Sequence, residues 1–542
     1  MPTTPTTKSQ VQAYRFVLRR MQSALVRKDA VMLHDPMRTH TRATVVGICI
    51  ASIGLIGFLI WGILSPQPAA PTSDGIVIGK PSGQVYVLIA KPDRKLIPVF
   101  NLASARLLLM AQSQDQSQNQ ANGAAAAPAA SAGAVKVVAP SVVDDNQLRD
   151  IPKGRKVGIA DGPDLLPSPD QRIDSVWTVC DQYILNKDLN EPASENKVET
   201  TVMAGVKDLG KTLPQDQSLL VKAPDGATYL VYRTPGTANL PNTSAVRAKV
   251  DLGRPEVRSA LDLTGKTPRV ITTGMLNAIP EKAELKSPDI PGRGTDSNID
   301  LGDQDLTKVG SVFKVERAGE ETKYYVLLKD GIQPVKQSTA DLIRYYDNPG
   351  APEIRAVNPD KVSGLDDPKV IDDSTYPAEA TDVLDPDAFP VACLGWSYTG
   401  SGEDADERTA VYIGKALPGI QLDSKGTPDY VDISTPSADG IRVDHFYMPP
   451  GRGAVVRQAT SKEDFTSGRI TLISDRGVKY GIPDDATAKG LGLDNQVPAP
   501  ENIIRLLPDG ASLSVKDVKQ SYDSTPFAGG QYPSTTKNSG GG

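Results

Sequence analysis

The chain has 542 residues, long enough for several domains, and its 59 basic and 65 acidic side chains give a net charge of −6. It has three histidines and three cysteines, and no His/Cys cluster with the spacing of a zinc site. We therefore expect no metal site and no cofactor.

An amphipathic helix is predicted first, over residues 9–28. Its apolar residues recur at spacings of three and four, which places them in one narrow stripe: Val11, Tyr14, Leu18, Met21 and Leu25. Two interpretations stay open for this helix: it lies on the anionic inner face of a membrane, or it docks on a cytoplasmic partner. The narrow stripe fits a seam against another helix better than a broad membrane face.

An apolar segment follows, and Thr44–Leu64 contains no charged residue. As a helix, this segment would extend roughly 30 Å, which matches the ~30 Å hydrocarbon core of a bilayer. A cleaved signal usually has an apolar region of about 7–15 residues close to the N-terminus. This segment is longer and starts far from the N-terminus, so the sequence predicts a retained single-span anchor.

The distribution of charge predicts the orientation of the anchor. Residues 1–43 contain eight basic and two acidic side chains, a net charge of +6, which leaves −12 for the rest of a chain whose total is −6. The positive-inside rule places the N-terminus in the cytoplasm and the large C-terminal part outside it. An acidic exterior part lacks the basic patches that nucleic-acid binding needs, so we expect no nucleic-acid partner.

The exterior part contains two low-complexity stretches and a recurring pattern. Residues 111–134 are rich in Gln, Ser and Ala and predict a flexible linker, and the tail from residue 525 is predicted to be extended. A strand bearing a tyrosine, followed by a polar turn, recurs four times, with Tyr86, Tyr229, Tyr325 and Tyr480 as markers. The spacing is irregular, which excludes a solenoid and favours four related β-hairpin-plus-helix modules scattered around a central region.

Two of the three cysteines lie in the exterior part. Cys180 and Cys393 each stand close to a tryptophan, whereas Cys49 lies within the apolar span. An oxidising compartment favours a disulfide between Cys180 and Cys393. Such a bond would close a long loop and contribute about 4–5 kcal/mol in the chain-entropy account.

Catalytic patterns are weak. Gly265-Lys266-Thr267 resembles the end of a phosphate-binding loop, but Ala260 stands where that motif needs a glycine and Pro268 follows at once. A serine-protease-like triad would have to use His445, and no nucleophile-elbow motif lies near it. The sequence predicts no catalytic residue.

Several motifs together resemble the EccB family, a core membrane subunit of the type VII (ESX) secretion machinery of mycobacteria and related actinobacteria. They occur in order along nearly the whole chain, and the most specific is Asn101-Leu102-Ala103-Ser104-Ala105-Arg106-Leu107. The others are "VQAYRFVLRRM", "DPMRTHTRA", "SVWTVCD", "ACLGWS", "GMLNAIP", "YYVLLKDGIQPV", "VKYGIPDDATAKGLGL" and "IIRLLPDGASLS".

The resemblance implies a single-pass protein of the cytoplasmic (inner) membrane. It implies an elongated, β-rich α+β periplasmic region in which four strand-turn-helix repeats surround a disulfide-bonded central domain. The implied partners are EccC (the motor ATPase), EccD, EccE, the mycosin protease, other EccB chains and membrane lipid. Family members are often labelled ATPases or ATP-binding. Three functions therefore compete: a structural scaffold, an ATPase or other hydrolase, and a cell-wall or ligand-binding receptor.

The predicted order is a cytoplasmic segment (1–43), a transmembrane helix (44–64), a first repeat (65–110), a low-complexity linker (111–134), a first central part (135–200), a second repeat (201–265), a linker with the third repeat (266–350), a second central part (351–465), a fourth repeat (466–520) and an extended tail (521–542).

Overall fold

A computed structural model describes residues 7–27, 36–64, 71–91, 93–121, 137–184, 197–234, 245–348, 350, 352–400, 406–420, 429–434, 441, 443–459 and 467–520. The predicted tail at 521–542 lies outside the described residues, as does most of the predicted linker. The chain divides into two compact units, Met1–Ala69 and Ala70–Gly542, and each is described by itself.

The N-terminal unit consists of two helices, α1 (Lys8–Arg27) and α2 (Pro36–Leu64). Within α2, Thr41–Gly62 is long and apolar enough to cross a membrane, and none of this stretch is buried. Its apolar side chains point to all sides, as expected of a helix surrounded by lipid and not of a helix at the edge of a soluble core.

The first sheet of the second unit is a three-stranded meander closed by a parallel strand. It contains β1 (Gly75–Lys80), β2 (Val85–Ile89), β3 (Lys95–Pro98) and β4 (Ser141–Asp144), in the order β3-β2-β1-β4. The meander is antiparallel, and β4 pairs parallel with β1 after the helix α3 (Leu102–Ala121). A parallel return needs such a crossover, because the chain must travel back along the sheet.

Three further sheets repeat this order and these strand directions. The third repeat has β13 (Val312–Val315), β14 (Lys323–Leu327), β15 (Ile332–Val335), α6 (Gln337–Asp347) and β16 (Arg355–Ala356). The fourth has β22 (Gly453–Ala459), β23 (Arg469–Ser474), β24 (Lys479–Ile482), α8 (Asp485–Leu491) and β25 (Val497–Pro500). The second has β8 (Gln217–Lys222), β9 (Thr228–Arg233), β10 (Ala245–Lys249), α4 (Pro255–Ala260) and β11 (Arg269–Val270), with β12 (Glu281–Lys282) and β17 (Asp382–Val383) added at its margins.

The four tyrosines do not mark the same strand of each module, which corrects their use as equivalent markers of the repeat. Tyr86, Tyr229 and Tyr325 lie on the middle strand of their meanders, whereas Tyr480 lies on β24, the third strand. The proline that precedes the crossover helix is the better marker. Pro98 and Pro334 lie on third strands, and Pro483 directly follows one.

The sheets also extend past the predicted module boundaries. β4 belongs to the first sheet although it lies beyond residue 110, and β22 opens the fourth sheet although it lies before residue 466. Parallel pairing joins strands that are far apart in sequence, so local patterns do not reveal the last strand of a module.

The crossover helices begin at capping residues that the sequence supplies. Asn101 accepts a hydrogen bond from the backbone N–H of Ser104 at the start of α3, and Asp484 accepts one from the N–H of Thr487 at the start of α8. These bonds satisfy N–H groups that have no partner within the helix. Gly492 ends α8 in the left-handed conformation, which glycine adopts without steric cost.

The prediction that residues 111–134 form a flexible linker is wrong at its start. Helix α3 continues to Ala121. Ala103, Leu107 and Ala111 bury one side of its first half, and half of residues 112–121 are Gln, which has a good helix propensity. Residues 122–134 lie outside the described residues.

A seven-stranded sheet forms the centre of the second unit, in the order β20-β21-β6-β5-β18-β19-β7. Its strands are β5 (Val176–Ile184), β6 (Lys197–Ala204), β7 (Lys211–Thr212), β18 (Val391–Thr399), β19 (Asp406–Gly414), β20 (Val431–Asp432) and β21 (His445–Tyr447). The remaining short helices are η1 (Asp145–Leu148), η2 (Pro169–Gln171), α5 (Thr273–Ala278), α7 (Pro359–Val362), α9 (Glu501–Ile504) and η5 (Asp517–Lys519).

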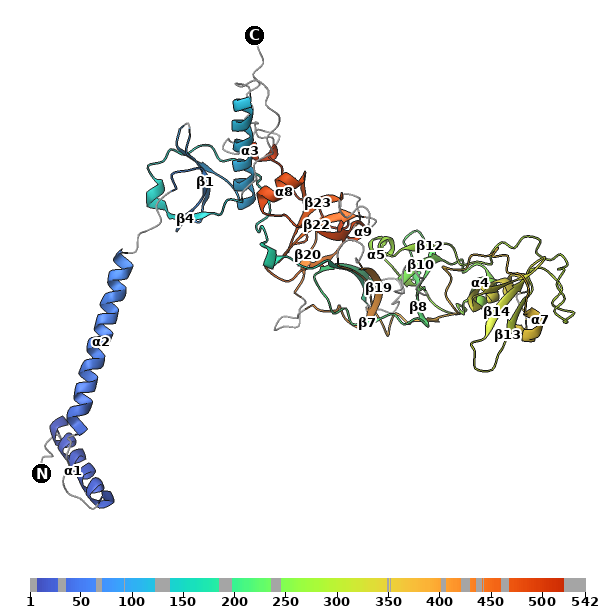
Figure 1. Ribbon diagram of the computed structural model, residues 1–542, viewed down its shortest axis with the longest axis horizontal. Helices are drawn as coiled ribbons and strands as arrows, with labels where there is room; N and C mark the ends of the chain where they lie inside the picture. The colour runs from blue at the N-terminus through green and yellow to red at the C-terminus, as the bar shows by residue number, and fades with distance from the viewer. Residues whose placement is uncertain are drawn as a thin grey trace, which may run out of the picture. The chain divides into compact units, whose positions relative to one another are not determined.

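Some modules share a core of buried apolar residues, and some have cores of their own. The first and fourth modules share one core, in which Val87 and Leu107 pack with Leu472 and Leu491. Helices α3 and α8 lie side by side in this core, as Figure 1 shows. The third module has two cores of its own, and Leu342 on its helix α6 also belongs to a core shared with the second module. The central sheet packs its core against the second and fourth modules.

Candidate functional site

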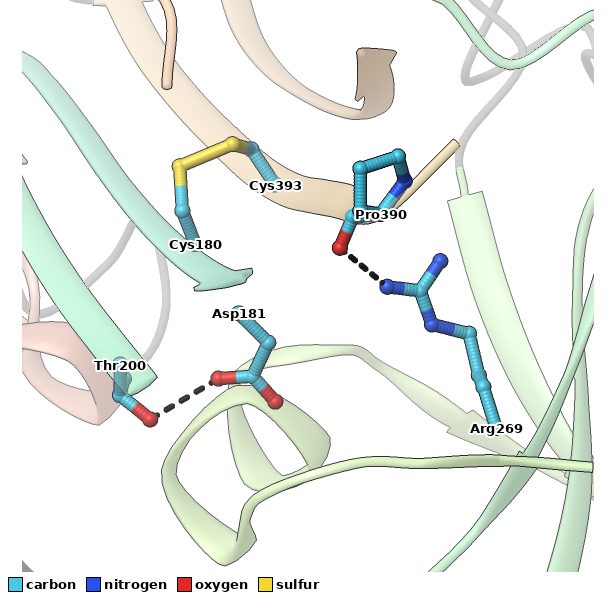
Figure 2. Close-up of a disulfide and its surroundings, with 6 residues drawn as sticks. All are labelled: Cys180, Asp181, Thr200, Arg269, Pro390 and Cys393. Carbon is cyan, nitrogen blue, oxygen red and sulfur yellow. Dashed lines mark hydrogen bonds between the residues drawn. A yellow bond between two sulfur atoms is a disulfide. The ribbon is translucent and has the colours of Figure 1, made fainter. Parts of the chain in front are cut away.

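A disulfide joins Cys180 on β5 to Cys393 on β18, which confirms the predicted pair. The two cysteines stand opposite each other in the antiparallel register, with their Cα atoms 3.9 Å apart, and both are buried. Figure 2 shows the bond between the two strands. It connects residues 213 positions apart in sequence, so the two halves of the central sheet are covalently held together.

The tryptophans near the cysteines are also cross-strand neighbours. Trp177 stands opposite Trp396 in the same strand pair. Each is three residues from its cysteine, so the tryptophans and the disulfide lie on opposite faces of the sheet. The tryptophan face packs on the large central core, and the disulfide face packs on a smaller core that includes Met203 and Tyr447.

A buried carboxylate adjoins the disulfide. Asp181 is 2% exposed and accepts three hydrogen bonds: from the backbone N–H of Thr272 (2.7 Å), from the hydroxyl of Thr272 (2.8 Å) and from the hydroxyl of Thr200 (2.9 Å). Figure 2 shows the bond from Thr200. Burial raises the pKa of Asp181 above its usual range, and these hydrogen bonds and the nearby Arg269 oppose that rise.

Arg269 is the buried cation of this region. It is 5% exposed and donates to the backbone carbonyls of Phe389 (2.9 Å) and Pro390 (2.8 Å), just before β18 begins. Burial lowers the pKa of this guanidinium, which stays charged because an arginine titrates so far above neutrality. Arg269 and Thr272 belong to the second module, so this polar cluster fastens that module to the disulfide-bonded sheet.

Sequence reasoning missed this polar cluster. The signal was a single acidic residue directly after Cys180 within a largely apolar strand. A lone carboxylate in a buried strand requires hydrogen-bond donors, but the sequence does not identify them, because Thr272 and Arg269 lie on distant segments.

The family-like stretch at 101–107 lies at the junction of the first and fourth modules. Arg106 donates a hydrogen bond from Nη1 to the carbonyl of Leu491, at the C-terminal end of α8. Arg172 reaches the same helix end and donates to the carbonyl of Gly492 at 2.8 Å. Cations at a helix C-terminus satisfy free carbonyls and oppose the negative end of the helix dipole.

The five predicted docking residues lie together on α1. Their exposed fractions are 40% for Val11, 67% for Tyr14, 38% for Leu18, 53% for Met21 and 81% for Leu25. Val17, at 51%, lies at the edge of the same stripe and was not predicted to belong to it. The structure therefore brings these residues together on one apolar face of α1.

Gly265-Lys266-Thr267 forms a turn between α4 and β11. The backbone N–H of Lys266 donates to the carbonyl of Leu263, and Gly265 adopts a φ of 75°. The next element is the short strand β11, whereas a phosphate-binding loop leads into a helix whose N-terminus faces the phosphates. The geometry is that of a turn.

His445 is held between two carboxylates. Its Nδ1 lies 2.8 Å from Asp432 and its Nε2 lies 3.2 Å from Glu199, while its ring packs 4.0 Å from that of Tyr430. Both ring nitrogens therefore face acceptors, and neither faces a hydroxyl that it could activate. Within the described residues, no group of three or more His, Cys, Asp or Glu side chains is placed to hold a metal ion.

The comparisons with known proteins decide the family. The family described as "Type VII secretion system ESX-1, transport TM domain B" matches residues 3–527. The chain belongs to the EccB family. The match spans both units, so the exposed helix α1, the apolar helix α2 and the five sheets of the second unit all belong to the family's architecture.

Curated EccB relatives align over nearly the whole chain. The "ESX-1 secretion system ATPase EccB1" of Mycolicibacterium smegmatis is 29% identical and covers 96% of both chains. The "ESX-2 secretion system ATPase EccB2" of Mycobacterium tuberculosis is 29% identical and covers 98% of this chain and 97% of its own.

Solved structures share the fold. A chain of an intact ESX-5 inner membrane complex matches with a TM-score of 0.64 and 23% identity, covering 99% of both chains. A chain of the EccB3 dimer from the ESX-3 core complex matches with a TM-score of 0.62 and 25% identity, covering 82% of this chain and 99% of its own.

Proposed function

We propose that this chain is a structural subunit of a type VII secretion complex in the inner membrane, and that it scaffolds the periplasmic part of the export machine. The observation that carries the proposal is the family match across residues 3–527, which includes a membrane-spanning helix and a large, disulfide-bonded second unit. A scaffold needs a rigid body and an anchor, and the chain has both.

The orientation follows from charge. Residues 1–43, which carry a net charge of +6, stay in the cytoplasm, and the −12 remainder lies in the periplasm. The buried disulfide supports this assignment, because disulfides persist in oxidising compartments. The four sheets with one topology act as repeat modules around the central disulfide-bonded domain.

The partners follow from the family. EccC, EccD and EccE would contact the cytoplasmic and membrane parts, and the mycosin protease would contact the periplasmic part. Other copies of the chain would contact its second unit, as the EccB3 dimer from the ESX-3 core complex suggests. The exposed stripe on α1 is the docking surface for a cytoplasmic partner.

The scaffold role is non-enzymatic. The curated relatives carry the word ATPase in their names, but the segment that most resembles a nucleotide loop is a turn followed by a strand. The buried carboxylate at Asp181 is fully supplied with donors and sealed from solvent, which suits structure and not catalysis.

Affinity purification from membranes in mild detergent tests the proposal. The tagged chain should bring down other secretion subunits, identified by mass spectrometry, in amounts comparable to its own. A tagged, unrelated single-span protein of the same membrane is the control. Recovery of the chain without any secretion subunit would overturn the scaffold role.

A further inference from the structure

A pocket of about 460 Å³ lies between the second and third modules. This volume falls within the range of ~300–1,000 Å³ that is common for small-molecule sites, which often form where two packed bodies meet. Helices α4 and α6 pack on each other beside it. The side chains that matter below are Arg254 before α4, Tyr346 on α6, and Lys286, Asp289 and Arg293 on the connecting segment.

One wall of the pocket is fixed in place. Arg293 donates to the hydroxyl of Ser287 at 2.8 Å and to the carbonyl of Pro288 at 2.9 Å, and pairs with Asp347 at 3.3 Å. Its guanidinium lies 4.8 Å from the ring centre of Tyr346. These contacts hold the tyrosine ring at the pocket although 53% of that residue is exposed.

The other cations are less engaged. Arg254 pairs with Asp251 through Nε at 3.3 Å, and both side chains of this pair are nearly half exposed, so the pair is weak and screened. Lys286 is exposed, and no ion pair to its Nζ occurs among the described residues. Lys286 is therefore the cation that a ligand would meet first.

We propose that this pocket binds a sugar-sized ligand that carries one carboxylate or phosphate. The oxyanion would bind Lys286 and the outer nitrogens of Arg254, because ammonium and guanidinium groups form the strong, charge-assisted bonds to such anions. The exposed face of Tyr346 would pack on the ligand's apolar surface. Asp289 would accept hydrogen bonds from its hydroxyl groups.

The pocket stands out from its surroundings in charge. The residues after α2 carry −12 in total, yet three cations and one carboxylate line this pocket. Asp251 and Asp347 pair with the two arginines and Asp289 offsets Lys286, so the local charge is close to zero, and the site fits a ligand with a single anionic group and not a polyanion. The proposal is independent of the scaffold role, since a subunit of an assembly can also hold a small ligand.

Calorimetric titration of the full chain in detergent tests the proposal. Three probes share one ring: glucuronate carries a carboxylate, glucose 6-phosphate carries a phosphate, and glucose carries neither. We expect saturable binding of at least one anionic probe and none of glucose. The stronger of the two anionic probes identifies the oxyanion. Equal binding of glucose, or no saturable binding of either anion, would overturn the proposal.

Two variants locate the site. Lys286→Ala should weaken binding of the anionic probe about tenfold, the usual effect of losing a hydrogen bond to a charged group. Lys282→Ala removes another exposed lysine four positions earlier, on β12, and should leave binding unchanged. Equal affinities of the wild type and Lys286→Ala would place the anion elsewhere and overturn the assignment. Because Lys286 is exposed, its replacement should not disturb folding.

Discussion

The two units of the chain differ in whether their large apolar side chains are buried or exposed. In the second unit, large residues such as Trp177, Tyr232 and Phe446 are fully buried, and cores extend from one module into the next. In the first unit, every residue of the α1 stripe is at least 38% exposed, and the apolar stretch of α2 has no buried residue.

The second unit therefore buries its apolar residues within itself, whereas the first unit depends on other molecules to cover its apolar residues. The second unit covers its large apolar residues with its own side chains, and it also supplies the hydrogen-bond donors around Asp181. The first unit must obtain cover from a bilayer for α2 and from another surface for α1, because exposed apolar area of this kind is costly in water. Changes in the first unit should therefore affect assembly, and changes in the second should affect stability.

The largest effect is expected from charges on the α1 stripe. Leu18→Asp with Met21→Asp would bury two unpaired charges at a docking seam, a cost of several kcal/mol. Since α2 is unchanged, the protein should still reach the membrane. We expect loss of co-purifying secretion subunits and of secretion, measured in membrane extracts and culture medium.

A matched double variant controls for added charge. Ser9→Asp with Gln12→Asp introduces the same two charges, also three residues apart, at exposed positions on the opposite face of α1 and should assemble normally. If the Leu18/Met21 variant also assembles normally, α1 does not dock on a partner, and the alternative of a helix lying on the membrane surface takes its place.

Removal of the disulfide should give the largest loss of stability within the second unit. Cys180→Ala with Cys393→Ala should lower the free energy of unfolding by about 2–5 kcal/mol, because the bond restrains a long loop in the unfolded chain. Denaturant titration of the detergent-solubilised chain measures this change. Cys49→Ala, within α2, is the control and should leave the unfolding midpoint of the second unit unchanged.

Loss of Arg106, one of the two arginines at the end of α8, should have a smaller effect. Arg106→Ala leaves the carbonyl of Leu491 without this donor and should cost about 1–3 kcal/mol. The loosening should be local, and hydrogen exchange should rise in α3 and α8 before it rises in the third module, which has separate cores. Arg106→Lys keeps the charge and should recover part of the protection; equal exchange in all three proteins would contradict a role at this junction.

The buried carboxylate predicts a dependence on pH. Because burial raises the pKa of Asp181 in the folded state, the folded protein holds this proton to higher pH than the unfolded chain does. The corresponding stability is fully present below the unfolded pKa of about 3.9 and is lost as pH rises through the folded value. The stability of the wild type relative to Asp181→Asn should therefore fall as pH rises from about 4.

The asparagine is the informative replacement because its amide can still accept from the N–H of Thr272 and donate to the two threonine hydroxyls. Asp181→Ala leaves these donors unpaired and should be less stable than Asp181→Asn at every pH. A difference between wild type and Asp181→Asn that does not change with pH would mean that this carboxyl titrates alike in the folded and unfolded chains.

The sequence predicted features that depend on local patterns. The apolar stretch of α2, the strand-turn-helix order and the cysteine pair all follow from composition, spacing or residue type. The closing strands β11 and β16 could not be predicted, since each has two residues and is defined only by its parallel partner. The donors around Asp181 could not be predicted either, because they lie on segments that meet only in the folded chain.

The smallest effect on stability and secretion is expected from replacement of Lys266. This residue distinguishes the enzyme interpretation, which requires it, from the scaffold interpretation, which does not. Lys266 is half-buried in a turn whose neighbours Gly265 and Thr267 are exposed. Among the described residues only its backbone N–H makes a hydrogen bond, to the carbonyl of Leu263. Lys266→Ala keeps that N–H and the left-handed glycine before it, so stability should change by less than about 0.5 kcal/mol. Secretion and any ATP hydrolysis by the purified chain should also be unchanged, whereas a nucleotide-loop lysine is required for turnover. Loss of an ATPase activity that persists after removal of the motor subunit would restore the enzyme interpretation and place nucleotide at this turn.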